Sequence, residues 1–164
     1  LEPDLFNAGI RPALNIGISV SRVGGNAQIK AMKKVSGPLK LDLAQFRALA
    51  AFAKFGSDLD KATQFQLNRG AKLTEIMKQK QFVPMRVENQ VALIWAVTNG
   101  YCDDIPTTNL AKYEHDYLEH LENMHKDLLV AIISSKEISK ETEARLKELT
   151  DKFTAQFKAG IGLN

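Results

Sequence analysis

Residues 106–133, PTTNLAKYEHDYLEHLENMHKDLLVAII, decide the fold class of this chain. Apolar side chains recur there at intervals of three and four residues, the spacing that places side chains on one face of an α-helix. The members of this stripe are Leu110, Tyr113, Tyr117, Leu121, Met124, Leu128 and Ile132. The spacing predicts a single long helix that starts at Pro106-Thr107-Thr108 and buries this face against other helices.

A second amphipathic segment follows toward the carboxyl end. Ser139 is a residue type that caps helix N-termini, and the stripe after it has the same helical spacing. This stripe consists of Thr142, Leu146, Leu149, Phe153 and Phe157. The two segments predict an antiparallel helical hairpin joined by residues 134–138. Its apolar stripe suits packing onto a bundle, and it has too few heptads for a free coiled coil.

Further helices are expected between residues 27 and 100. The stretch 39–53 repeats apolar residues at helical spacing and predicts a mostly buried helix. Glycine and proline set the expected breaks, which fall at Ser36-Gly37-Pro38, Gly56, Gly70 and the loop 79–84. Ser57 with Asp60 three residues later is typical of a capping box that opens a helix over about residues 59–68. Gly100 is placed to end the helix whose face carries Val87, Val91, Ile94, Trp95 and Thr98.

The first 22 residues have a different character. They contain Pro3, Gly9, Pro12 and Gly17, which disfavour a helix. They predict a turn and then one strand over about residues 13–20, and a single strand needs a sheet that this sequence does not supply. Arg22 follows that strand, and Gly24-Gly25 predicts a sharp turn after it. Arg22 has two interpretations: a strand-end arginine paired with a surface acid, or a guanidinium presented to a phosphate or carboxylate supplied from elsewhere.

The composition is that of a folded domain. With 164 residues, 45% of them hydrophobic and 25% charged, the chain suits one core. No apolar run approaches the ~20 residues of a membrane span. Cys102 is the only cysteine, which excludes an internal disulfide and fits a reducing compartment. Leu1 is not an initiator methionine and no signal peptide follows it, so we expect a fragment or a processed product of a longer polypeptide.

Charge is distributed unevenly along the chain. Residues 1–80 carry 13 Lys and Arg against 6 Asp and Glu, a net charge of +7, whereas residues 81–164 carry 9 against 13, a net charge of −4. A basic half suits nucleotides or acidic neighbours. Nucleic acid is not expected as a partner, because the lysines are dispersed and aromatic residues do not alternate with them as a stacking platform.

Residue types that carry catalysis do not converge in the sequence. His115, His120 and His125 are spaced by five residues, which turns each one about 140° from the last on a helix, so they cannot share one face. Asp103-Asp104 lies in an expected turn and is predicted to be solvated. No glycine-rich loop ending in Gly-Lys-Ser/Thr is present, so the chain alone is not expected to hydrolyse ATP.

Several segments resemble one family. Residues 9–28, GIRPALNIGISVSRVGGNAQ, are similar to the carboxy-terminal part of the alpha subunit of the F-type ATP synthase. The resemblance continues through LAQFR at 43–47, FGSDLD at 55–60 and KQKQ at 78–81. It covers the first hundred or so residues densely and the remainder loosely, so no residue beyond about Ile105 is assigned a role from it.

The resemblance implies roles for five residues. Arg22 matches the arginine that reaches across the alpha–beta interface to the terminal phosphate of a nucleotide on the beta subunit, an arginine finger supplied in trans. Phe6, Arg11, Gln79 and Gln81 match positions that line the alpha subunit's own non-catalytic nucleotide site, with the glutamines near the adenine. From the residues alone, each glutamine is also explained as a plain polar loop residue. The implied cofactors are ATP or ADP with magnesium in the complete subunit, and none is expected for this chain alone.

The resemblance also implies an assembly. The expected partners are the beta subunit, in an alternating alpha/beta hexamer, and the gamma subunit of the central stalk, in an enzyme that couples ATP synthesis and hydrolysis to ion translocation. Ser57-Asp58-Leu59-Asp60 match the rotor-facing end of the helical domain, although helix capping explains this segment equally well. The implied location is peripheral, on the cytoplasmic face of the bacterial plasma membrane or the matrix face of the mitochondrial inner membrane, with membrane contact only through the complex.

The expected organisation is therefore mainly α. Residues 27–164 form a carboxy-terminal helical bundle, and residues 1–26 carry the last strand of an incomplete P-loop-type nucleotide-binding domain with the arginine-finger turn. The phosphate loop and the magnesium-binding acid of the family are absent from this sequence. A protein of another class fits as well: a non-enzymatic helical interaction module that docks on an acidic partner through its basic first half, with Arg22 setting the register of that contact.

Overall fold

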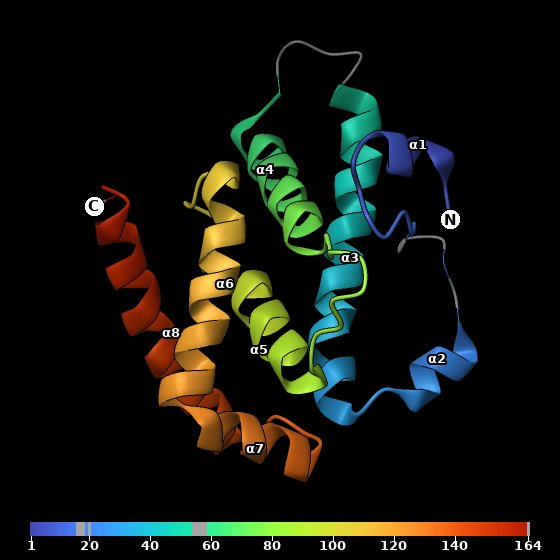
Figure 1. Ribbon diagram of the computed structural model, residues 1–164. Coiled ribbons are helices and arrows are strands. Elements are labelled where there is room, and N and C mark those ends of the chain that lie inside the picture. The colour runs from blue at the N-terminus through green and yellow to red at the C-terminus, as the bar shows by residue number, and fades with distance from the viewer. Residues whose placement is uncertain (16–18, 20, 54–58, 164) are drawn as a thin grey trace.

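The structure is a computed structural model that describes residues 1–15, 19, 21–53 and 59–163. No residue in these ranges lies in a β-strand. The helices are α1 (Pro3–Asn7), α2 (Arg22–Ala27), α3 (Lys30–Ala53), α4 (Lys61–Ile76), α5 (Val87–Thr98), α6 (Thr107–Met124), α7 (Lys126–Ser135) and α8 (Lys140–Gly160) (Figure 1). The predicted helical bundle is confirmed. Four of the eight residues of the strand expected over 13–20, namely 16–18 and 20, lie outside the described residues, so the strand stays a prediction.

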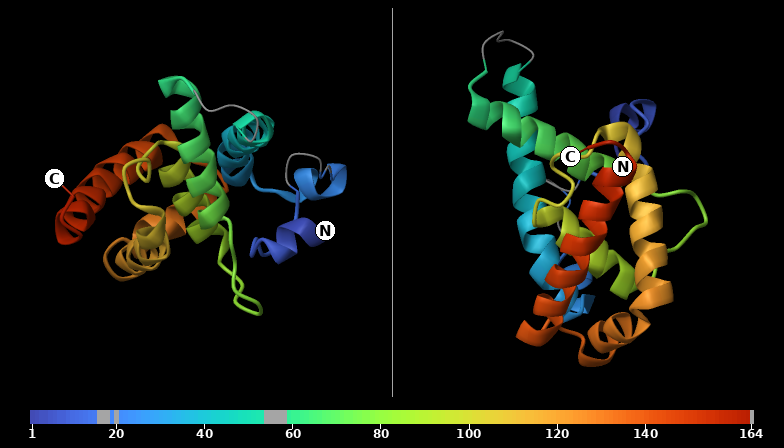
Figure 2. Two further views of the ribbon diagram at one scale, coloured as in Figure 1. Left: turned by 90° about the horizontal axis from the view of Figure 1, so that it is seen from above. Right: turned by 90° about the vertical axis from the view of Figure 1, so that its left-hand side faces the viewer.

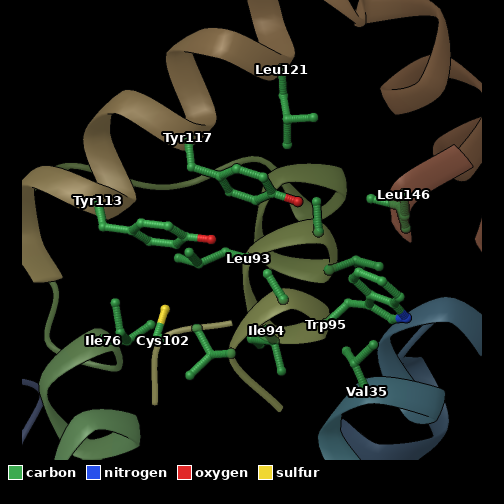
Figure 3. Close-up of a cluster of buried hydrophobic side chains, with 14 of the residues drawn as sticks. Val35, Ile76, Leu93, Ile94, Trp95, Cys102, Tyr113, Tyr117, Leu121 and Leu146 are labelled. Carbon is green, nitrogen blue, oxygen red and sulfur yellow. The ribbon is translucent and has the colours of Figure 1, made fainter. Parts of the chain in front are cut away.

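Helix α5 is the centre of the bundle. Asn89 and all of residues 91–97 are buried, because neighbouring helices surround α5 on every side. A helix in this environment has an apolar run instead of an amphipathic stripe, as the sequence VALIWAV has. Figure 3 shows Leu93, Ile94 and Trp95 lying among side chains from α3, α4, α6 and α8. Gly100, with φ +89, follows the end of α5 as predicted, since this backbone conformation favours glycine.

Helices α6 and α8 bury their predicted stripes against each other and against α5. The hydroxyl pairs Tyr113–Thr154 and Tyr117–Thr150 are 2.9 and 2.8 Å apart in the buried interface. Each pair satisfies two polar groups that burial would otherwise leave without partners. Ser139 caps α8 as expected, because its Oγ accepts the N–H of Thr142 at 3.1 Å.

The single long helix predicted over 107–133 is wrong. It breaks at His125, which has φ −136° and ψ 34°, and α7 turns across the lower end of the bundle in Figure 1. The turn lets Leu128 and Ile132 remain fully buried beside α5 and α8. Met124, a member of the predicted stripe, is instead 69% exposed at the break.

Helix α3 runs without interruption through Pro38, so the break predicted there is also wrong. Proline inside a helix costs about 3 kcal/mol because it lacks a donor and clashes with the preceding turn. Burial opposes this cost: Ala31, Val35, Leu39 and Leu43 recur every four residues on both sides of Pro38 and are all buried. Beyond Leu43, the helix is only partly buried, contrary to the expectation for 39–53.

Helix α4 differs from prediction at both of its landmarks. Its N-cap is Asp60, whose carboxylate accepts the N–H of Thr63 at 2.8 Å. Ser57, the other member of the predicted capping box, lies outside the described residues. The expected terminator Gly56 lies outside them too. Gly70 does not end a helix but lies inside α4, where a Cβ would stand 2.2 Å from the Cβ of Phe46 in α3. Gly70 is therefore required for the close approach of α3 and α4.

Arg69 ties α4 to three other parts of the chain. Its guanidinium donates to Asp42 of α3 at 3.3 Å, to Asp103 at 2.8 Å and to the carbonyl of Thr98. The Asp103 side chain is 19% exposed, so the prediction that both aspartates are solvated is wrong for Asp103. It holds for Asp104, whose exposed carboxylate accepts from Lys158.

Candidate functional site

The loop between α4 and α5 and the amino-terminal segment form one site. Residues 79–84 are not helical, as predicted, and this loop stands away from the bundle. The backbone N–H of Gln79 donates to the carbonyl oxygen of Arg11 at 2.7 Å. This hydrogen bond joins two segments that are far apart in the sequence.

The amino-terminal segment holds itself in shape by short-range contacts. The backbone N–H of Glu2 donates to the carbonyl of Ala13 at 2.9 Å, and the Asn15 amide donates to the Glu2 carboxylate at 2.7 Å. The carbon at the centre of the Arg11 guanidinium lies 4.3 Å from the centroid of the Phe6 ring. This is a cation–π contact, and it places the guanidinium over the ring.

An open cavity of about 840 Å³ lies between the loop and this segment. Four residues predicted as a nucleotide site line it together: Phe6, Arg11, Gln79 and Gln81. They supply an aromatic face, a fixed cation, and amides that both donate and accept hydrogen bonds. Such a set can hold a planar polar ring and a neighbouring anion, and the volume lies within the range of small-molecule sites.

Sequence reasoning missed other residues of this cavity. Lys80, Pro12 and Ala13 also line it. Lys80 adds a second cation between the two glutamines. Its place between Gln79 and Gln81 in the chain was the one available signal, since neighbouring loop residues commonly share a site.

Arg22 lies apart from this cavity. It is the first residue of α2, is exposed, and does not line the cavity. The sharp turn expected at Gly24-Gly25 is instead part of this short helix. The cause is a cap: Ser21 Oγ accepts the N–H of Gly24 at 3.0 Å. The structure therefore presents Arg22 at the start of a helix and brings it to none of the other predicted site residues.

The histidines form no metal site. Within the described ranges, no group of three or more His, Cys, Asp or Glu side chains is placed to hold a metal ion. The break at His125 brings the His125 and His120 rings together, with their centroids 5.1 Å apart. His115 does not take part in this pair. The Cys102 thiol is fully buried, and burial raises its pKa to about 12. A thiol in this state is a poor nucleophile at neutral pH.

These features define a class: an all-α domain with a buried central helix and an open site between its α4–α5 loop and the segment that precedes the bundle. Residues 28–153 match the family model described as ATP synthase alpha/beta chain, C terminal domain, and the chain belongs to this family. Gln79 and Gln81 lie within the matched range, whereas Phe6, Arg11 and Arg22 precede it. None of the helices in the described residues is long and apolar enough to cross a membrane.

Proposed function

We propose that this chain is part of the alpha subunit of a rotary F-type ATP synthase and that its loop cavity holds the adenine end of a non-catalytic nucleotide. One observation carries this proposal. Phe6, Arg11, Gln79 and Gln81 come from two distant segments, and all four line one cavity. Residues without a shared role would not be expected to line one cavity from two distant segments.

The chemistry of the cavity supports a purine ligand. The amides of Gln79 and Gln81 match the alternating donors and acceptors on the edge of adenine. The Arg11 guanidinium, stacked on Phe6, is always charged and suits an anionic group of the nucleotide. The sequence holds no phosphate loop, so groups that bind the phosphates and magnesium would come from other parts of the complete subunit.

Arg22 would act in trans as an arginine finger. Its guanidinium is exposed at the start of α2 and is free to reach a neighbouring chain. Charge spreads over the phosphoryl oxygens in the transition state of ATP hydrolysis, and such an arginine is worth about 10³ to 10⁵ in rate in related hydrolases. The neighbouring chain would be the beta subunit of an alternating alpha/beta hexamer.

The assembly would be peripheral to the membrane and contact it only through other subunits. The α3–α4 end would face the gamma subunit of the central stalk, where Asp60 would supply an acidic group; Asp58 lies outside the described residues. Asp60 is also the N-cap of α4, so capping and stalk contact would share one residue. ATP synthesis and hydrolysis would be coupled to ion transport in this complex.

Nucleotide binding tests the cavity. In the assembled enzyme, Arg11→Ala and Gln79→Ala should each weaken binding at the non-catalytic site by about tenfold, since each removes an interaction worth ~1.4 kcal/mol. Gln66→Ala, on the exposed face of α4, is the matched control and should change nothing. The isolated 164-residue chain should bind ATP only weakly. Calorimetry that finds micromolar affinity for the isolated chain would contradict this expectation.

Turnover tests Arg22 independently. Arg22→Ala in the assembled enzyme should cut multisite ATP turnover severely and leave subunit assembly intact. Arg22→Lys keeps the charge but loses the planar fork of donors, so it should restore only part of the rate. Near-normal turnover of Arg22→Ala would refute the role in trans.

A further inference from the structure

The sequence contains one Asn-Gly pair, Asn99-Gly100, and it lies at the end of the central helix α5. The side-chain amide of an asparagine can be attacked by the backbone nitrogen of the next residue. Glycine shields this nitrogen least, because it has no Cβ. Such an intramolecular reaction is fast once the two groups meet, and it makes asparagine a thermolabile residue. Every other internal asparagine of the chain precedes a residue with a side chain.

The reaction is a deamidation that consumes only water. The Gly100 nitrogen gives up its proton and bonds to the Asn99 Cγ, while the Cγ–Nδ2 bond breaks and the amide nitrogen takes up the proton and leaves as ammonia. The product is a cyclic imide. Water then breaks the bond from the imide nitrogen to Cγ, which gives aspartate, or the bond to the backbone carbonyl carbon, which gives isoaspartate with a methylene added to the main chain.

The native structure engages both reacting groups elsewhere. Asn99 is the C-cap of α5, and its Nδ2 donates to the carbonyl oxygen of Trp95 at 2.7 Å, so the side chain is turned back along the helix. The Gly100 N–H donates to the carbonyl oxygen of Val97 at 3.1 Å. Both hydrogen bonds have to break before the nitrogen can reach Cγ. Asn99 is exposed, so the geometry of the cap limits the reaction and access of water does not.

Further contacts hold this cap in place. The Tyr101 N–H donates to the carbonyl oxygen of Ala96 at 3.2 Å, and together with the Gly100 bond this closes the last turn of α5. The Arg69 guanidinium donates to the carbonyl oxygen of Thr98 in the same turn. Figure 2 shows the chain leaving this turn toward α6. The end of α5 is therefore fixed by several bonds that open together.

The products of deamidation cannot rebuild the cap. A carboxylate at position 99 only accepts hydrogen bonds, so the donor to the Trp95 carbonyl is lost. It also places a negative charge at the C-terminus of α5, where the helix dipole disfavours one. Isoaspartate lengthens the main chain directly before Gly100, whose surroundings are tight: a Cβ on Gly100 would lie 3.1 Å from the Asp103 carboxylate.

We propose that Asn99-Gly100 is a deamidation site controlled by the C-cap of α5. The closed cap prevents the reaction, opening of the last turn permits it, and the product weakens the central helix. A chain modified while α5 is open therefore does not regain its full stability. Local opening of this kind occurs in native proteins without global unfolding. The inference does not depend on nucleotide binding.

Mass spectrometry tests the proposal directly. The 164-residue chain is incubated at mildly alkaline pH in buffer and, separately, in guanidinium chloride, and is then digested with trypsin. The tryptic peptide 87–112 contains Asn99 and also Asn89 and Asn109, which serve as internal controls. In denaturant, Asn99 should deamidate faster than either control. In buffer, its deamidation should be at least about tenfold slower than in denaturant, because the cap has to open first.

Two results would overturn the proposal. Equal rates at Asn99 in buffer and in denaturant would exclude control by the cap. The absence of any excess at Asn99 over Asn89 and Asn109 in denaturant would exclude the site itself.

Matched variants test the control by the cap. Arg69→Met removes the donor to the Thr98 carbonyl and leaves both reacting groups unchanged, so it should raise the rate in buffer and not the rate in denaturant. Arg145→Met removes an arginine that pairs with Asp127 at the surface and should change neither rate. Equal increases in the two variants would contradict the proposal. Should Arg69→Met not fold, the unmodified chain decides: across a guanidinium series the rate should follow hydrogen exchange of the Tyr101 amide, and a rate independent of that exchange contradicts the proposal.

The effect of the product is tested separately. Asn99→Asp reproduces one product and should lower the urea midpoint of unfolding. Asn68→Asp makes the same change of charge on the exposed face of α4, away from a helix end, and should lower the midpoint less. Equal midpoints for the two variants would show that the product does not weaken α5.

Discussion

The bundle around α5 and the site on the α4–α5 loop are built in opposite ways. The core is a continuous set of buried apolar side chains, joined by two buried tyrosine–threonine pairs. The site is open and rests on few contacts, among them the backbone bond from Gln79 to Arg11 and the stacking of Arg11 on Phe6. The difference indicates that the packed core and the proposed binding site use separate residues, so each can be changed while the other is measured.

The largest effect should come from Gly70 in the core. Gly70→Ala would place a Cβ 2.2 Å from the Phe46 Cβ, and since that atom is attached to the backbone it cannot rotate away. We expect a loss of about 3 kcal/mol in the free energy of unfolding, measured by urea denaturation. Combining it with Phe46→Gly should recover most of the loss attributable to the clash. A stabilised Gly70→Ala, the outcome expected from helix propensity alone, would show that α3 and α4 are not in close contact.

The buried hydroxyl pair of Tyr117 should rank second. Tyr117→Phe leaves the Thr150 hydroxyl buried without a partner, at a cost of about 2 kcal/mol. Tyr101→Phe is the matched control, because Tyr101 donates to Asp151 at the exposed surface and should lose much less. The double variant Tyr117→Phe with Thr150→Val should cost less than the sum of its single variants. Additive losses would argue against the pair.

A change at Arg11 should separate the two regions. Arg11→Ala removes an exposed cation–π contact, so the free energy of unfolding of the bundle should change by less than about 1 kcal/mol. The amide shifts of residues 79–81 should move, since Arg11 and Gln79 share a backbone bond. Cooperative loss of the whole bundle in this variant would show that the site and the core are a single unit.

The smallest effect concerns pH. Burial and the neighbouring His125 hold the pKa of His120 below its ordinary value of 6.5. The unfolded chain therefore binds the proton more tightly, and the stability that this histidine contributes is present above pH 6.5 and is lost as the pH falls through the lower folded value. The ring is largely solvated, so the change should stay below about 0.5 kcal/mol. His120→Gln should flatten the pH dependence of urea midpoints between pH 5 and 7, and an unchanged slope would contradict the assignment.

Local sequence patterns predict a helix correctly where one apolar face packs against the core. The stripe of α8 and the cap at Ser139 follow from spacing and residue type, and both are correct. Pro38 and Gly70 mislead because their local preference is overridden by tertiary packing: a buried stripe crosses Pro38, and Phe46 requires the space at Gly70. No glycine or proline lies at the His125 break to predict it, and the turn leaves Leu128 and Ile132 buried beside α5 and α8.

Local sequence patterns predict the candidate site less well than they predict the helices. No periodicity relates Phe6 and Arg11 to Gln79 and Gln81, because their contact is a long-range one made by two irregular segments. Resemblance to a family suggested the set, and the structure supplies the geometry.

Trp95 is the only tryptophan of the chain, and it lies in α5 with its indole nitrogen 3.4 Å from the Glu143 carboxylate. Because Trp95 is buried in the core, its fluorescence responds to changes in the bundle and little to changes at the surface. Its emission should report whether the bundle is intact and remain nearly silent when a ligand enters at the loop. An optical signal for binding therefore has to be introduced, and because Cys102 is fully buried, a second cysteine at exposed Phe82 offers a place to label the loop selectively.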